Sequence, residues 1–198
     1  MCGRPANACI CRWVVPVPHA VEVLILQHPL EVAHPKNTAR LLQLCLARSR
    51  LVVGESFADD TWLAAGWQAG DAPRRTVLLY PDTAADRAED LVPPPPMPPG
   101  WHTAPEALRL VVLDATWRKS RKMLYQSPAL QRLPRLALEA LPASRYAIRK
   151  AQRPHQLSTF ESTCAALARL EPLFEARAAA LQAAFDGFVA QQAAYRPD

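Results

Sequence analysis

Long apolar runs are missing from this sequence. No stretch approaches the ~20 consecutive apolar residues that a membrane-spanning helix requires. The first residues, MCGRPANACICRW, also lack the continuous apolar core of a signal peptide. We see no internal repeat. We therefore expect a cytoplasmic protein that has no membrane as a partner.

The composition is that of a folded globular protein. Half of the 198 residues are hydrophobic and 21% are charged, which excludes a disordered chain. This length accommodates one substantial domain. We expect that domain to span residues 19–198, after a small cysteine-rich segment at residues 1–18 that is a possible zinc site.

The positive charge is clustered. The net charge is +5 and the isoelectric point is about 9.2. Two basic groups carry the excess, whereas residues 82–90 are acidic. Such clusters suit phosphate groups, although arginine and lysine also keep helix faces solvated. The two groups are Arg118, Lys119, Arg121 and Lys122, and Arg145, Arg149, Lys150 and Arg153.

Short aliphatic and β-branched runs predict strands at residues 21–27, 50–55, 75–81 and 108–114, with a fifth at 144–150. Helical patterns fall between and after them, at about residues 37–49, 116–126, 158–170 and 172–194. This alternation is typical of an α/β fold with a mostly parallel sheet and helices on both faces. Ligands of such folds bind beyond the carboxyl ends of the strands, so we expect the site at that rim. The rim would carry Gly54, Pro81, Asp114 and the segment after Lys150.

The stretch VVLDATWRKSRKM, residues 111–123, places Asp114 at the end of a predicted strand and a basic helix directly after it. A carboxylate beside so much positive charge suits an anionic ligand handled next to an acid or base. The alternative is a strand, a tight turn and a solvated helix face.

Three cysteines, Cys2, Cys9 and Cys11, lie close together near the N-terminus. Thiolates suit zinc, and a structural zinc site uses four ligands in a tetrahedron. His19 or a cysteine upstream of Met1 would supply the fourth. The alternative is three incidental reduced thiols.

Two further patterns fall beside predicted element ends. His28 and Glu31 follow the first strand and could orient a polar ligand, although their spacing also fits an ordinary turn contact. Ser158 and Glu161 have the spacing of a capping box. The same helix N-terminus could also receive a carboxylate or phosphate.

Taken together, these segments resemble the DTW-domain family of tRNA-uridine aminocarboxypropyltransferases. The resemblance rests on CGRPANACIC at 2–11, ILQHPLEVAHPKNTARLL at 25–42, LDATWRKSRKM at 113–123 and RYAIRKAQRPHQLSTFES at 145–162. The D-x-T-W motif of the family falls on Asp114, Thr116 and Trp117. Its H-P-x-E motif falls on His28, Pro29 and Glu31, and its S-T-x-E motif on Ser158, Thr159 and Glu161. The family usually carries a further cysteine upstream of C-x-R-P, where this chain begins at Met1.

The resemblance implies a SPOUT-like knotted fold that binds S-adenosylmethionine near the knot. It implies transfer of the 3-amino-3-carboxypropyl group to N3 of a uridine in tRNA, with release of methylthioadenosine. Asp114 would then be the base or would orient the uracil edge, and Trp117 would stack on a base or on adenine. The tRNA phosphates would be bound by the basic residues at 118–122 and by Arg149, Lys150 and Arg153. The donor would be bound by Thr116, Trp117, Ser158, Thr159, Glu161, His28 and Glu31.

Three other functions are also compatible with the sequence. A SPOUT-like methyltransferase would use the same donor and a similar fold. A ribosomal-RNA aminocarboxypropyltransferase would differ in its acceptor. A zinc-stabilised RNA-binding module would have no activity, and Asp114 and Glu161 would then be structural.

Overall fold

The computed structural model describes residues 2–58, 61–81, 93–138, 144, 146 and 157–195. Its centre is a sheet of five parallel strands in the order β2-β1-β4-β3-β5. The strands are β1 (Glu22–Gln27), β2 (Ser49–Val53), β3 (Arg75–Leu79), β4 (Leu108–Asp114) and β5 (Arg135–Leu136). The predicted mostly parallel α/β sheet is confirmed.

The first four predicted strands are confirmed, with ends shifted by one or two residues. The fifth strand of the described sheet is β5, a two-residue strand that was not predicted. The stretch at 144–150, predicted as a strand, lies outside the described residues except for Ser144 and Tyr146, which are not in a strand. Arg145, Arg149, Lys150 and Arg153 also lie outside the described residues.

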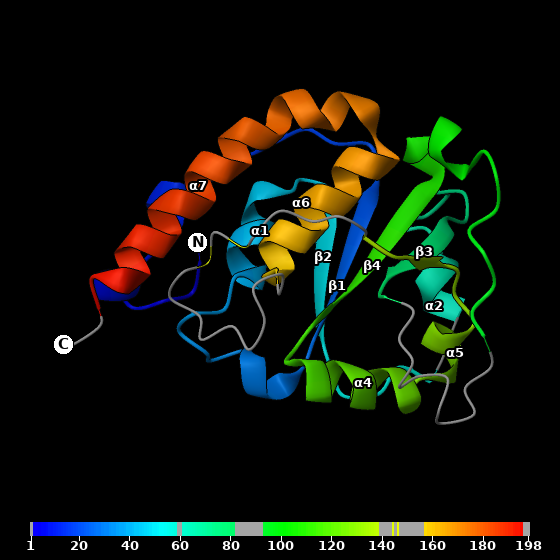
Figure 1. The fold of residues 1–198 in the computed structure, drawn as a ribbon, viewed down its shortest axis with the longest axis horizontal. Coiled ribbons are helices and arrows are strands. Elements are labelled where there is room, and N and C mark those ends of the chain that lie inside the picture. The colour runs from blue at the N-terminus through cyan, green and yellow to red at the C-terminus, as the bar shows by residue number, and fades with distance from the viewer. Residues whose placement is uncertain are drawn as a thin grey trace.

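Helices cover both faces of the sheet, as predicted (Figure 1). One face packs against α1 (Ala39–Cys45), α6 (Thr159–Leu170) and α7 (Glu175–Ala193) through one apolar core. The other packs against α2 (Thr61–Ala64), α4 (Trp117–Tyr125) and α5 (Pro128–Gln131) through a second core. Short 3-10 helices complete the fold: η1 (Ala6–Ala8), η2 (Cys11–Trp13), η3 (Pro29–Glu31), η4 (Trp101–Thr103), η5 (Pro105–Ala107) and η6 (Pro172–Phe174).

The central strands are apolar because both of their faces are covered. All six residues of β1 are buried, and their side chains alternate between the two cores, Val23 and Ile25 in one and Leu24 and Leu26 in the other. A continuous apolar run is therefore the pattern that such a strand needs.

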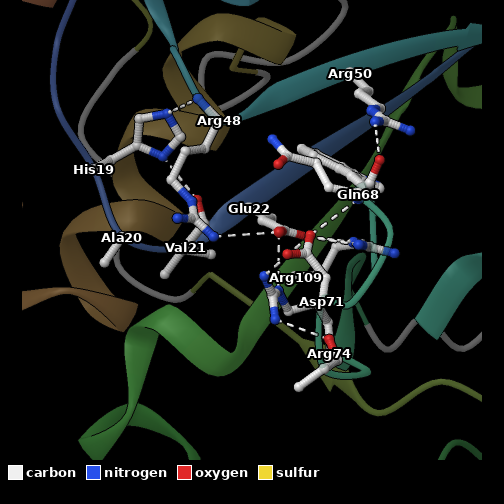
Figure 2. A network of polar contacts seen from close by, with 12 residues as sticks. His19, Ala20, Val21, Glu22, Arg48, Arg50, Gln68, Asp71, Arg74 and Arg109 are labelled. Atoms are coloured by element: carbon white, nitrogen blue, oxygen red, sulfur yellow. Dashed lines mark hydrogen bonds and ion pairs between the residues drawn. The ribbon is translucent and has the colours of Figure 1, made fainter. Parts of the chain in front are cut away.

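A polar network closes the amino ends of the strands (Figure 2). The Glu22 carboxylate, 2% exposed, accepts hydrogen bonds from Arg48, Arg74 and Arg109. The Arg109 guanidinium is fully buried and also lies over the Trp67 ring. Burying a charge is costly unless it is paired, and here one carboxylate compensates the buried arginine.

The cysteine-rich N-terminal segment packs against α7. The Trp13 indole N–H donates to Gln191 Oε1 at 2.5 Å, and Gln191 Nε2 donates to the Cys9 carbonyl at 3.0 Å. Gly187 lies directly under the Trp13 ring, where a Cβ atom would come within 2.3 Å of it. The absence of a side chain at Gly187 therefore lets the segment approach the helix.

Candidate active site

Asp114 ends β4 and is the centre of a buried hydrogen-bond cluster. Its Oδ2 accepts from Gln27 Nε2 at 2.8 Å and from Asn37 Nδ2 at 2.6 Å. Its Oδ1 accepts from the Thr159 hydroxyl at 2.6 Å. Asp114 is only 4% exposed, so all three donors are directed at a carboxylate that water barely reaches.

The sheet and two helix starts bring these four residues together. Gln27 and Asp114 are register partners at the carboxyl ends of β1 and β4. Asn37 precedes α1 and Thr159 is the first residue of α6. Because parallel strands end at one edge, helices that cover one face of the sheet can begin at the same point.

Two cavities lie beside the carboxyl end of β4, and Ala115 lines both of them. A polar cavity of about 340 Å³ is lined by Glu31, His34, Lys36, Asn37, Thr38, Asp114, Ala115, Thr116, Tyr146, Ser158 and Thr159. An apolar cavity of about 260 Å³ is lined by Leu79, Tyr80, Pro81, Val112, Leu113, Ala115, Trp117, Ser120, Leu136, Leu138, Leu157, Thr159 and Ser162. Ala115 and Thr159 line both cavities and therefore form their common wall.

Aromatic rings form part of the apolar cavity. Trp117 is 44% exposed and meets Tyr80 edge to face, with ring centroids 6.1 Å apart. The Arg135 guanidinium lies 5.2 Å from the Tyr80 ring centroid. An exposed indole at a cavity mouth can stack on a planar ring system.

The start of α6 is a capping box, as the sequence indicated. The Ser158 hydroxyl accepts from the Glu161 N–H, and the Glu161 carboxylate accepts from the Ser158 N–H at 2.8 Å. The Ser144 hydroxyl also donates to that carboxylate at 2.9 Å. Ser158 lines the polar cavity, whereas Glu161 lines neither cavity. The Glu161 carboxylate therefore accepts hydrogen bonds from the protein itself.

His28 and Glu31 do not meet at one ligand. His28 Nδ1 accepts from the Leu30 N–H at 3.2 Å, and its Nε2 lies 3.5 Å from Glu55 Oε1. The imidazole lines neither cavity. Glu31 does line the polar cavity, where Lys119 donates to it at 2.8 Å.

The basic residues of α4 are partly engaged with the protein itself. Lys122 pairs with Glu55 at 3.2 Å, and Arg121 donates to the Tyr125 hydroxyl at 3.2 Å. Arg118 is exposed and makes no ion pair with any residue that the structure describes. Arg118 is therefore the member of this group that is most available to a phosphate.

The three N-terminal thiols converge, with their sulfur atoms within 4.8 Å of one another. Hydrogen bonds from backbone groups at Ile10 and Arg4 lower the pKa of Cys2 to about 6, although burial opposes them. A thiolate at neutral pH is the form that binds a metal.

His19 does not complete this thiol cluster. Its Nδ1 lies 2.7 Å from the Val21 carbonyl, and its Nε2 accepts from the Arg48 N–H at 3.0 Å. Both ring nitrogens are therefore occupied. Among the described residues, the cluster offers three ligands.

Several site residues were missed by the sequence analysis, in particular Gln27, Lys36, Tyr80 and Tyr146. Gln27 directly precedes the His28 motif, but its contact with Asp114 depends on β1 lying beside β4. Asn37 was identified as a helix start, and the structure adds its bond to Asp114. The sequence indicated Tyr80 only through its position directly before Pro81, which was expected at the carboxyl ends of the strands.

Comparison with known proteins identifies one family. The model of the DTW domain matches residues 1–193. The chain is 36% identical to "tRNA-uridine aminocarboxypropyltransferase 2" of Drosophila melanogaster over 180 residues, which cover 89% of this chain and 67% of that protein. It is 29% identical to the Mus musculus protein of the same name, covering 86% and 55%. It is also 29% identical to "tRNA-uridine aminocarboxypropyltransferase A" of Arabidopsis thaliana, covering 66% and 51%.

The chain thus spans between about half and two thirds of the length of these relatives. No solved structure matches it. None of the helices in the described part of the chain has the length and apolar character needed to span a membrane.

Proposed function

The chain belongs to the DTW-domain family, and from this premise we propose that it modifies tRNA. It transfers the 3-amino-3-carboxypropyl group of S-adenosylmethionine to N3 of a uridine and releases methylthioadenosine. The observation that carries the proposal is that an apolar and a polar cavity adjoin at Ala115 and Thr159, and that Thr159 donates to the Asp114 carboxylate in the polar cavity. The donor can occupy the apolar cavity and extend the group to be transferred past the shared residues, where it meets the acceptor in the polar cavity.

The apolar cavity suits the adenosine part of the donor. Tyr80 and Trp117 offer ring surfaces for adenine. The carbon chain of the donor would pass Ala115 and Thr159, the residues common to both cavities. Thr116 and Ser158, which line the polar cavity, would bind the polar end of the group that is transferred.

The polar cavity suits the uracil of the acceptor. Its rim carries Glu31, His34 and Lys36, and Asp114 lies at its inner wall. Arg118 and the other basic residues of α4 follow directly after this wall and would contact the tRNA backbone. Arg149, Lys150 and Arg153, which lie outside the described residues, are proposed for the same role from the sequence.

The chemistry is a displacement at the carbon next to a sulfonium, and its leaving group is a neutral thioether. The enzyme has to align N3 with that carbon and remove the N3 proton. The placement of Asp114 between β1, α1 and α6 supports its assignment to the acceptor side. His28 and Glu161 support the site indirectly, through the turn after β1 and the start of α6.

Family membership also supports a SPOUT-like knotted arrangement near the donor site and action on tRNA in the cytoplasm. For the N-terminal segment we propose a structural zinc ion held by Cys2, Cys9 and Cys11, whose thiols already converge. The ion would cross-link the segment. Serine at all three positions should remove the zinc found by elemental analysis of the purified protein, and equal zinc content would contradict this site.

The test of the function is product analysis. Purified protein is incubated with unmodified tRNA transcript and S-adenosylmethionine, and the digested RNA is read by mass spectrometry. Aminocarboxypropyl-uridine with an equal amount of methylthioadenosine is the expected result. A methylated nucleoside would instead identify a methyltransferase, and tight tRNA binding without product would identify a binding module.

A further inference from the structure

The Asp114 carboxylate is not freely open to a substrate. Its Oδ2 already accepts two hydrogen bonds, from Gln27 and Asn37, and its Oδ1 accepts one from Thr159. The residue is 4% exposed. A uridine N3–H in the polar cavity would therefore meet the Thr159 hydroxyl on its way to Oδ1.

The Thr159 hydroxyl is placed to connect substrate and carboxylate. The Thr159 hydroxyl donates to Asp114 Oδ1, so its proton lies in this 2.6 Å bond. The threonine oxygen keeps lone pairs that can accept another hydrogen bond. Thr159 is only half-buried and lines both cavities, which places the residue where the two cavities adjoin.

Two side-chain amides fix the orientation of the Asp114 carboxylate. Asn37 Oδ1 accepts from the Ala39 N–H at 3.0 Å, so its amide nitrogen has to face Asp114. Gln27 reaches the same oxygen, Oδ2, from the neighbouring strand. These two residues are positioning residues, because they leave Oδ1 directed at Thr159.

We propose that Thr159 is a catalytic residue that relays the N3 proton of the uridine to Asp114, an inference that rests on the proposed transferase function. The N3 proton passes to Thr159 Oγ1 while the threonine proton passes to Asp114 Oδ1. The N3 electron pair forms a bond to the carbon next to the sulfonium. The carbon–sulfur bond breaks with its electron pair going to sulfur, which leaves neutral methylthioadenosine and a protonated Asp114.

The relay is tested with two substitutions, one that removes the hydroxyl and one that keeps it. Thr159→Val keeps the side-chain shape but removes the relay, and Thr159→Ser keeps the hydroxyl. Under single-turnover conditions with saturating donor and tRNA transcript, Thr159→Val should lower the transfer rate by about 10²–10⁴-fold, the usual contribution of general acid–base catalysis. Thr159→Ser should stay within about tenfold of the unaltered protein, and tRNA affinity should change little in either variant.

A pH series separates the relay from a structural role. Uridine that has lost its N3 proton to the solvent needs no relay, so the deficit of Thr159→Val should shrink as the pH rises into the alkaline range. A matched control is Thr163→Val on the same helix. The Thr163 hydroxyl donates to the Thr159 carbonyl at 2.7 Å and lines neither cavity, so this variant should keep its rate.

Three outcomes would overturn the relay. Equal rates for Thr159→Val and the unaltered protein would exclude a role for the hydroxyl. A deficit that stays constant with pH would indicate only a structural effect. Absence of transfer in the unaltered protein would refute the proposed function itself, and the relay with it, so the two failures are distinguishable.

Discussion

Glu22 shows what a single buried charge does in this fold. Its two oxygens receive guanidinium groups from Arg48, Arg74 and Arg109, which precede or begin three different strands (Figure 2). Arg109 is fully buried, whereas the Arg48 side chain is 41% exposed. Removing the carboxylate would leave a buried guanidinium without its counter-charge, which is costlier than removing an exposed partner.

Glu22→Gln should lower the free energy of unfolding by about 3–5 kcal/mol, the usual cost of breaking a buried ion pair. Arg48→Gln, the control, should change it by less than about 1 kcal/mol because that arginine is exposed to solvent. Urea denaturation of both variants measures the difference. If Glu22→Gln and Arg48→Gln lowered the free energy of unfolding equally, the buried carboxylate would not be the group that stabilises the network.

Cys164 predicts a pH dependence of stability. Burial, reinforced by Cys45 and Glu161, raises the pKa of its thiol to about 12 from an ordinary value of 9.0. Between these two pKa values the unfolded chain releases a proton that the folded chain keeps, so stability falls as the pH rises.

Between pH 8 and pH 11, the free energy of unfolding of the Cys164→Ala variant should fall less steeply with pH than that of the unaltered protein. In the unaltered protein, mass spectrometry after iodoacetamide treatment should find Cys164 unmodified at pH 9 and modified once urea is added. Rapid modification of Cys164 in the folded protein would contradict the raised pKa.

At the level of single residues, the sequence predicted which groups stand at element ends but not how they meet. Asp114 and Thr159 were predicted to lie at the end of a strand and the start of a helix, and the structure has them there. The bonds that join Gln27, Asn37 and Thr159 to Asp114 span 45 to 87 residues of sequence. Contacts of that kind depend on strand order, which a single sequence does not encode locally.

Among the elements, the long and strongly patterned ones were predicted well. α4, α6 and α7 lie within the expected ranges, with α7 preceded by the 3-10 helix η6. β5 has two residues, which is too short for any periodicity to appear. α1 ends at Cys45, earlier than predicted, because the backbone is extended at Leu46 and β2 begins at Ser49.

The contact between η2 and α7 predicts that Gly187→Ala changes the free energy of unfolding in opposite directions in the presence and absence of the Trp13 ring. In the unaltered protein, Gly187→Ala would push a methyl group into the Trp13 ring and should lower the free energy of unfolding by about 1–3 kcal/mol. In a Trp13→Ala background the same change should raise it by up to about 1 kcal/mol, because alanine favours a helix more than glycine does.

The free energies of unfolding are measured by chemical denaturation of the unaltered protein, the two single variants and the double variant of this cycle. If Gly187→Ala destabilised both backgrounds equally, the clash with Trp13 would not be its cause. The cycle therefore tests whether the cysteine-rich segment is seated on α7.

At the scale of the whole molecule, the two faces of the sheet have different tasks. The face with α1, α6 and α7 contributes Asn37 and Thr159 to the site, and the face with α4 carries the basic residues. Both meet at the carboxyl edge of β4, where Figure 1 shows α4 crossing the strand ends. The parallel sheet and this rim were predictable from apolar strands alternating with helices, whereas the division into two cavities was not.

Arg118 is exposed and is therefore expected to contact a tRNA phosphate. Arg118→Ala should weaken tRNA binding and lower the slope of log Kd against log salt by about 0.7–0.9, the value of one phosphate contact. Arg169→Ala on α6 is a control of equal charge, because Arg169 is exposed and bonds only the Ala137 carbonyl among the described residues. Filter binding over a range of salt concentrations measures both slopes, and identical slopes would place the tRNA elsewhere.

The cluster around Asp114 also has a consequence for how the protein is made. Its members come from residues 27, 37, 114 and 159, so a growing chain on the ribosome cannot complete it until α6 has emerged. Loop closure over such separations makes these contacts late steps of folding. A half-made or misfolded chain therefore has no assembled site, and under the proposed function only a fully folded molecule would bind the donor and tRNA.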